Sequence, residues 1–149
     1  MRKAPFWSTP LKNLLCIAGL VLGTLPAQAQ NAGPIRIGVL APITGPLATP
    51  GAEMIDGLKM FWDKNGNTVS GRKVELVIAD TTCNPDQALT QARRLALQEK
   101  VHFLLGPLCG HEGPAVAQVS KETGVPLVLD PAGADTNTKW DRTPTVIRT

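Results

Sequence analysis

The chain has 149 residues and carries 15 lysines and arginines against 12 aspartates and glutamates. This basic excess lies in the first 29 residues, which contain Arg2, Lys3 and Lys12, so the rest of the chain has 12 side chains of each sign. Because this remainder is neutral and has no basic run longer than Arg93-Arg94, we expect no nucleic-acid partner. Its length is that of one modest domain.

The first 29 residues have the organisation of a secretory signal peptide. The basic residues come first. They are followed by an apolar stretch, Leu14–Leu25 (LLCIAGLVLGTL), and then by a small-x-small cleavage pattern, Ala27-Gln28-Ala29. The apolar stretch is too short to span a bilayer, which requires about 20 residues. We therefore predict export, cleavage after Ala29, and a mature chain that begins at Gln30 without a membrane span.

Apolar runs typical of buried strands alternate with helical patterns along the rest of the chain. The strand-like runs are Ile35–Pro42, Lys73–Asp80, Val101–Pro107, Leu127–Asp130 and the start of a fifth, Thr145–Thr149. Between them, the spacing of apolar residues predicts helices over Gly51–Lys64, from Asn84-Pro85-Asp86 onward, and over Gly113–Thr123. This order indicates the α/β class, with a doubly wound parallel sheet and right-handed crossovers.

Two of the predicted helices carry further signals. Asn84 suits an N-cap, Pro85 the first helical position, and Asp86 places an acid in the first turn of the second helix. In the first helix, Phe61 and Trp62 lie on or beside the apolar stripe. We expect both aromatic side chains to pack in the core rather than to stack on a ligand.

Cys83 and Cys109 are the cysteines that remain after cleavage. In an oxidising compartment an even pair favours a disulfide, with two free thiols as the alternative. A metal site that adds His111 and His102 is a third interpretation, but the chain lacks the CxxC or HxxxH spacing of a zinc site. We therefore expect no metal centre.

In a doubly wound sheet, ligands bind beyond the carboxyl ends of the strands. Here these ends lead into segments in which glycine, proline and short polar residues let backbone N–H groups approach an anion: Ile43–Gly51, Asp80–Asn84, Leu108–Gly113 and Asp130–Asp135. None of them contains a GxGxxG fingerprint, a Walker loop or a GxSxG elbow. The sequence thus predicts a binding protein with no catalytic residues and no cofactor.

Four side chains near these ends have competing interpretations. His102 lies within a predicted strand, which favours a structural role, whereas His111 lies in a loop where it is better placed to contact a ligand. Asp80 and Asp130 both end strands, and carboxylates at strand ends commonly cap turns or helices. We therefore prefer capping to acid–base chemistry for both.

Six segments, taken in order, carry a resemblance to a known family. They are Ile35–Pro46 (IRIGVLAPITGP), the helix after Gly51, Asp80–Pro85 (DTTCNP), Leu105–Cys109 (LGPLC), Gly124–Pro126 (GVP), and Asp130–Ala132 (DPA) followed by Val146–Thr149 (VIRT). From about Ile35 to Thr149, the chain resembles the N-terminal part of type I periplasmic solute-binding proteins of ABC transporters, the leucine/isoleucine/valine-binding protein family.

The resemblance implies a periplasmic, two-lobed clamp that captures a small carboxylate-bearing solute and delivers it to a membrane permease. It also implies that the two cysteines form a disulfide. Carried over by position, the residues of the first lobe that hold the solute are Gly110, His111, Ala132, Gly133 and Ala134. A sensory ligand-binding domain of the same fold is the alternative function.

The chain departs from the family pattern in two ways. Amino-acid-binding members have hydroxyl side chains at the equivalents of Gly110 and Ala134, and this chain has none there. The solute is therefore left open between an amino acid and an aromatic or other organic acid. Family members are also more than twice as long, so we expect residues 30–149 to form an incomplete first lobe, from a fragment or a truncated gene product.

Overall fold

The computed structural model describes residues 33–130 and 143–149. The strands are β1 (Ile35–Ala41), β2 (Thr68–Val69), β3 (Arg72–Asp80), β4 (Phe103–Leu105), β5 (Leu127–Leu129) and β6 (Val146–Arg148). The helices are α1 (Ala48–Lys64), α2 (Pro85–Arg93) and α3 (Gly113–Thr123), with a π-helical turn η1 (Arg94–Gln98) and a 3-10 turn η2 (Gly110–Glu112). The predicted signal peptide and the predicted ligand-binding turn Ala132–Ala134 lie outside the described residues.

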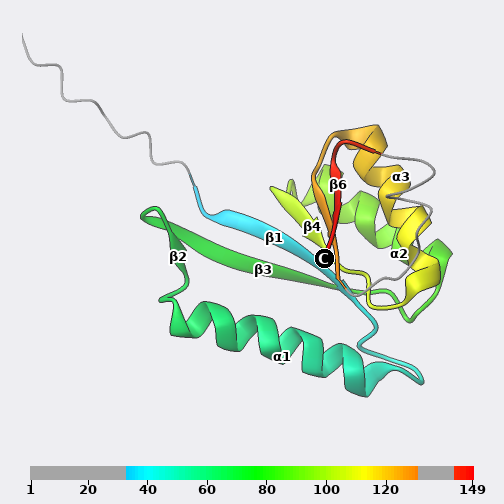
Figure 1. Ribbon diagram of the computed structural model, residues 1–149, viewed down its shortest axis with the longest axis horizontal. Helices are drawn as coiled ribbons and strands as arrows, with labels where there is room; N and C mark the ends of the chain where they lie inside the picture. Colours follow the sequence, from blue (N-terminus) through cyan, green and yellow to red (C-terminus); the bar gives the residue numbers. More distant parts are fainter. Residues whose placement is uncertain (1–32, 131–142) are drawn as a thin grey trace, which may run out of the picture. The chain divides into compact units, whose positions relative to one another are not determined.

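The described strands form one six-stranded sheet in the order β2-β3-β1-β4-β5-β6 (Figure 1). All neighbours pair in parallel except β2 and β3, which form an antiparallel hairpin. The turn of this hairpin is Ser70-Gly71, and both residues have positive φ angles, as the tight turns that match strand twist require. The predicted parallel α/β sheet is thus confirmed, with a short hairpin added at one edge.

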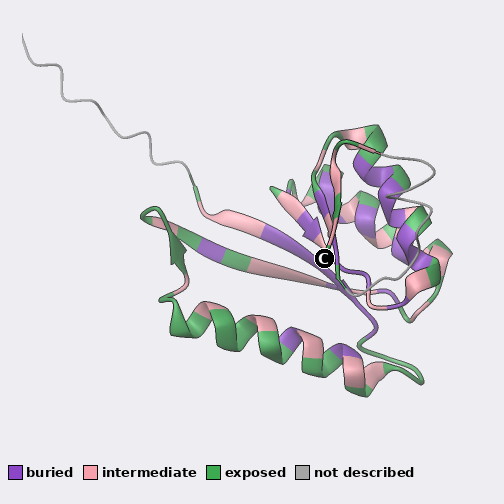
Figure 2. Cartoon of the chain, in the orientation of Figure 1, coloured by how far each residue is buried: buried purple, intermediate pink, exposed green. Residues whose placement is uncertain are grey.

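Helices cover both faces of this sheet (Figure 1). Along β1, Ile37, Val39 and Ala41 belong to the cluster that contains Ile55 of α1, whereas Leu40 belongs to the cluster under α2 and α3. This alternation is the two-residue period of a strand buried on both faces. Figure 2 shows the consequence, since buried residues gather in the central strands and on α2 and α3, while α1 keeps a broad exposed side.

The starts of the helices follow local signals. Asn84 caps α2 as predicted, because its side-chain oxygen accepts hydrogen bonds from the N–H groups of Asp86 (2.9 Å) and Gln87 (3.2 Å). The bounds of α3 agree with the predicted Gly113–Thr123. α1 begins at Ala48, before the predicted Gly51, and runs very close to β1. A Cβ atom on Gly51 would lie 1.8 Å from the carbonyl oxygen of Pro42, so only glycine fits there.

The core role predicted for Phe61 is wrong. Its side chain is 55% exposed, whereas Trp62 is half-buried and packs against the cluster around Ile55. The reason is helical geometry: Ile55, Leu58 and Trp62 follow one another at helical spacing on the sheet-facing side, and Phe61 lies about 100° away from Trp62. Phe61 instead meets Trp62 edge to face, with ring centroids 5.1 Å apart.

Two features are absent from the part of the chain that the structure describes. No helix within residues 33–130 and 143–149 combines the length and apolar character needed to cross a membrane. The same residues contain no group of three or more histidine, cysteine, aspartate or glutamate side chains arranged to hold a metal ion.

Candidate ligand-binding site

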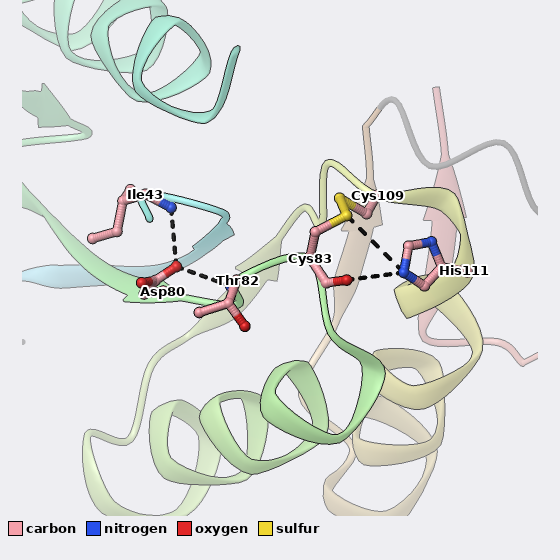
Figure 3. The surroundings of a disulfide bond; sticks show 6 residues. All are labelled: Ile43, Asp80, Thr82, Cys83, Cys109 and His111. Atoms are coloured by element: carbon pink, nitrogen blue, oxygen red, sulfur yellow. Dashed lines mark hydrogen bonds between the residues drawn. A yellow bond between two sulfur atoms is a disulfide. The ribbon is translucent and has the colours of Figure 1, made fainter. Parts of the chain in front are cut away.

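The carboxyl ends of β1, β3 and β4 bring three loops to one edge of the sheet. Ala41 of β1 is in register with Asp80 of β3, and Leu105 of β4 with Val39 of β1, so the loops that follow these strands are neighbours. These are three of the four segments that the sequence singled out. Figure 3 shows side chains from these loops in contact across the edge.

A disulfide joins Cys83, after β3, to Cys109, after β4 (Figure 3). The two Cα atoms are 5.7 Å apart, which is within the usual range for a disulfide. Because β1 lies between β3 and β4 in the sheet, this bond closes over the carboxyl end of β1. Of the alternatives left open by the sequence, the structure has the disulfide.

His111 is directed back toward the loop after β3 (Figure 3). Its Nε2 atom lies 3.0 Å from the carbonyl oxygen of Cys83 and 4.0 Å from the Cys83 sulfur. Because a carbonyl only accepts hydrogen bonds, Nε2 carries the proton and donates it. This hydrogen bond fixes the position of the turn that contains His111. The residue is nevertheless exposed, so a ligand can reach it. Contact with a ligand stays a prediction for this residue.

Gly110 and His111 lie in the turn η2, which continues directly into α3. Within this stretch the N–H of Glu112 donates to the carbonyl oxygen of Cys109, the N–H of Gly113 donates to that of Gly110, and Pro114 has no N–H. The donors that this end can offer to an anion are therefore the N–H groups of Gly110 and His111, and the helix dipole favours an anion there. Gly110 is half-buried and has no side chain, so a ligand can approach its N–H closely. The arrangement supplies neutral hydrogen-bond donors rather than an acid, a base or a nucleophile.

The loop between β4 and η2 also requires glycine. Gly106 has a φ angle of 102° and precedes Pro107 through a cis peptide bond. A Cβ atom on Gly106 would lie 2.3 Å from the carbonyl oxygen of Leu40. This close approach holds the loop against β1, so the path from β4 to Cys109 is fixed by backbone contact.

Asp80 caps the loops after β1 and β3, in agreement with the capping interpretation. Its carboxylate accepts hydrogen bonds from the N–H groups of Ile43 (3.0 Å) and Thr82 (2.9 Å) and from the Thr44 hydroxyl (2.5 Å). Burial by itself would raise the pKa of Asp80, but the hydrogen bonds from Thr44, Ile43 and Thr82 together lower it. Asp80 is therefore an ionised brace and not a proton donor.

The other two side chains with competing interpretations, His102 and Asp130, take no part in the hydrogen bonds around Asp80. The Nδ1 atom of His102 accepts a hydrogen bond of 3.1 Å from the N–H of Arg36, near the start of β1, which fits the predicted structural role. This contact is at the opposite end of the strands from the disulfide. Asp130 follows β5 and is exposed.

Glu112 is a residue of this region that sequence reasoning missed. It ends η2, its side chain is 0% exposed, and so is that of Thr81 in the loop after β3. Burial raises the pKa of Glu112, and its polar neighbours, Thr81 foremost, offset this effect only in part. Nothing in the sequence marks this acid, because glutamate in the first turn of a helix is ordinarily exposed.

Comparison with known proteins decides the family. A family model described as periplasmic binding protein matches residues 34–149. The chain belongs to the periplasmic binding protein family. This agrees with the resemblance and with the fold, and the relatives described below are named as binding proteins.

Individual relatives place this periplasmic binding protein more closely. It is 38% identical over 125 residues to "Leu/Ile/Val-binding protein homolog 7" of Brucella suis, covering 81% of this chain and 30% of that protein. Among solved structures, a leucine-binding protein from Thermotoga maritima matches with a TM-score of 0.71 and 28% identity, covering 76% of this chain and 32% of that one. A solute-binding protein from R. palustris in complex with benzoate matches with a TM-score of 0.73 and 28% identity, covering 78% and 32%.

The shares of the relatives' chains that are covered show how much of such a protein this chain contains. It spans about a third of the length of the relatives that it matches. The matched part is the α/β sheet described above, which agrees with an incomplete first lobe.

Proposed function

We propose that this protein is the solute-binding component of an ABC transporter, which captures a small carboxylate-bearing solute and delivers it to a membrane permease. Residues 1–29 act as a signal peptide that is removed after Ala29, and the mature protein works in the periplasm. Residues 30–149 form the N-terminal part of the first lobe. In this proposal the solute lies between that lobe and a second one.

The observation that carries the proposal is the turn at Gly110 and His111. The N–H groups of these two residues lie just before α3, beside two loops that are fixed by the disulfide and by Asp80. Neutral amide donors on a rigid edge suit a carboxylate, because they bind it without adding an opposite charge. The turn Ala132–Ala134, whose side chains are small, is proposed as the second set of donors.

The class of solute follows from chemistry that two relatives share. One matched structure is a leucine-binding protein and another holds benzoate, and both ligands carry a carboxylate. The turn that would face this group has no hydroxyl side chain in the present chain. We therefore propose recognition of the carboxylate by backbone amides, with an amino acid or an aromatic acid as the solute.

Calorimetric titration of the full-length product of the coding frame with leucine and with benzoate tests this proposal. We expect one of the two to bind with a Kd of about 1 μM or less. Gly110→Leu should abolish binding, because the new side chain covers the amides. Gly57→Leu is the matched control, since Gly57 is exposed on α1 and a Cβ atom there meets nothing within 4 Å.

Two results would contradict the proposal. Unchanged affinity of the Gly110→Leu variant would refute the site. Equal affinity of the 149-residue chain and the full-length product would refute capture between two lobes, because a single lobe cannot exclude water from its ligand.

A further inference from the structure

We propose that Glu112 is a positioning residue: its buried carboxyl group holds the turn Gly110–His111 against the loop after β3 from the interior side. The proposal rests on the proposed function, in which this turn contacts the solute. The position of the binding turn then depends on whether the buried carboxyl group of Glu112 is protonated.

The first step is the position of Glu112 between two loops. Its N–H donates to the carbonyl oxygen of Cys109 at 3.0 Å, which closes the turn η2. Across from it, the N–H of Asn84 donates to the carbonyl oxygen of Thr81 at 2.9 Å, which closes the loop after β3. The same two loops are also joined by the disulfide, whose Cys109 is buried, and by the exposed His111. Glu112 and Thr81, both 0% exposed, lie on the inner side.

The second step is the state of the buried groups. Within residues 33–130 and 143–149, neither Glu112 Oε1, Glu112 Oε2 nor Thr81 Oγ1 has a hydrogen-bond partner of good geometry. An ionised carboxylate in such a place carries a large desolvation penalty, whereas a protonated one can both donate and accept a hydrogen bond. The Thr81 hydroxyl has the same two capacities, so a neutral Glu112 and Thr81 complement each other.

The third step is the set of groups that act on this carboxyl. His111 comes from its own turn, the Thr81 hydroxyl and the Asn84 N–H from the loop after β3, and the Cys109 N–H from the loop after β4. The acid at the end of β3, Asp80, is engaged by Ile43, Thr44 and Thr82. Burial outweighs these partners and raises the pKa of Glu112.

The sign of the pH dependence follows from that direction. A carboxyl whose pKa is higher in the folded than in the unfolded state binds more protons when folded. Its contribution to stability is fully present below the unfolded pKa of glutamate, about 4.3, and is lost as the pH rises through the folded value. Ionisation therefore loosens the two loops that Glu112 holds together.

Three variants and one control test the proposal in the full-length protein. Glu112→Gln keeps the size and hydrogen bonds of a neutral acid, Glu112→Leu keeps the volume only, and Thr81→Val removes the partner hydroxyl. Glu53→Gln, on the exposed side of α1, is the control. The measurements are urea midpoints between about pH 5 and 8, exchange rates of the hydrogen-bonded amides of Asn84 and Gly113, and titration with leucine and benzoate.

We expect the urea midpoint of Glu112→Gln to rise relative to wild type as the pH increases, while Glu53→Gln keeps a constant offset. Glu112→Gln should retain solute affinity and slow amide exchange. Glu112→Leu should bind about tenfold more weakly and exchange the Asn84 and Gly113 amides faster, and Thr81→Val should change both in the same direction. A merely structural role would lower the midpoint without this rescue by glutamine.

A pH-independent offset for Glu112→Gln, or wild-type amide exchange in Glu112→Leu, would overturn the proposal. If Glu112→Leu fails to fold, the pH profile of Glu112→Gln and the exchange rates of Thr81→Val still decide. If neither leucine nor benzoate binds the wild type, the proposed solute class fails, whereas the midpoints and exchange rates continue to test Glu112.

Discussion

Removal of the disulfide should cost the described unit a predictable share of its stability. Cys83 and Cys109 are separated by 26 positions, and the loop-entropy relation gives about 3.5 kcal/mol for closing a loop of that length in the unfolded chain. The double variant Cys83→Ala/Cys109→Ala removes the bond without leaving a thiol. Its free energy of unfolding should therefore fall by about 3.5 kcal/mol relative to the oxidised protein.

Urea unfolding at neutral pH measures this difference. The slope of the transition should also increase in the variant, because the unfolded chain without the cross-link exposes more surface. The reduced wild-type protein is a second control, and it should resemble the double variant. A loss below about 1 kcal/mol, with an unchanged slope, would refute the reasoning. It would mean that residual structure already constrains the unfolded chain between the two cysteines.

Three further predictions concern stability. Phe61→Ala should lower the free energy of unfolding by less than about 1 kcal/mol, whereas Leu104→Ala in the buried core should lower it by roughly 2–5 kcal/mol. Comparable losses for the two variants would contradict the assignment of Phe61 to the surface. Asn84→Ala should cost about 1 kcal/mol in thermal or urea unfolding, because α2 loses its N-cap, and Asn84→Ser should restore most of it. The lowered pKa of Asp80 adds stability above the unfolded pKa of aspartate, about 3.9, and this stability is lost as the pH falls through the folded value. Asp80→Asn should therefore make the free energy of unfolding less dependent on pH in the acid range. An unaltered pH dependence would show that the charge of Asp80 does not stabilise the loops that it caps.

The sequence predicts elements best where side chains act locally. The N-cap at Asn84 and the helix from Gly113 to Thr123 agree with the structure, because capping groups and the terminal Gly124 mark their ends directly. The hairpin of β2 was missed, since two residues are too few to produce a recognisable alternation. The early start of α1 depends on the turn at Gly45, where the Ala48 N–H donates to the Gly45 carbonyl oxygen. The spacing of apolar residues cannot predict this hydrogen bond.

The candidate site divides in the same way. Its location follows from the rule for parallel sheets, and the resemblance supplies the disulfide and the positions Gly110 and His111. The hydrogen bond from His111 to Cys83 could not be predicted, because it depends on how two distant loops meet. Glu112 was missed for a related reason, since its burial arises from the packing of both loops around it.

The central place of β1 has a consequence for the order in which the molecule is made. β1 is the first of the described strands, yet it pairs with β3 on one side and with β4 on the other. A chain synthesised from its N-terminus therefore cannot complete the middle of its sheet until Leu105 has been added. Contacts between such distant segments are closed slowly. Ile35–Ala41 thus lack part of their native pairing until Phe103–Leu105 has been made, and a polypeptide in that state can still be threaded through a narrow channel.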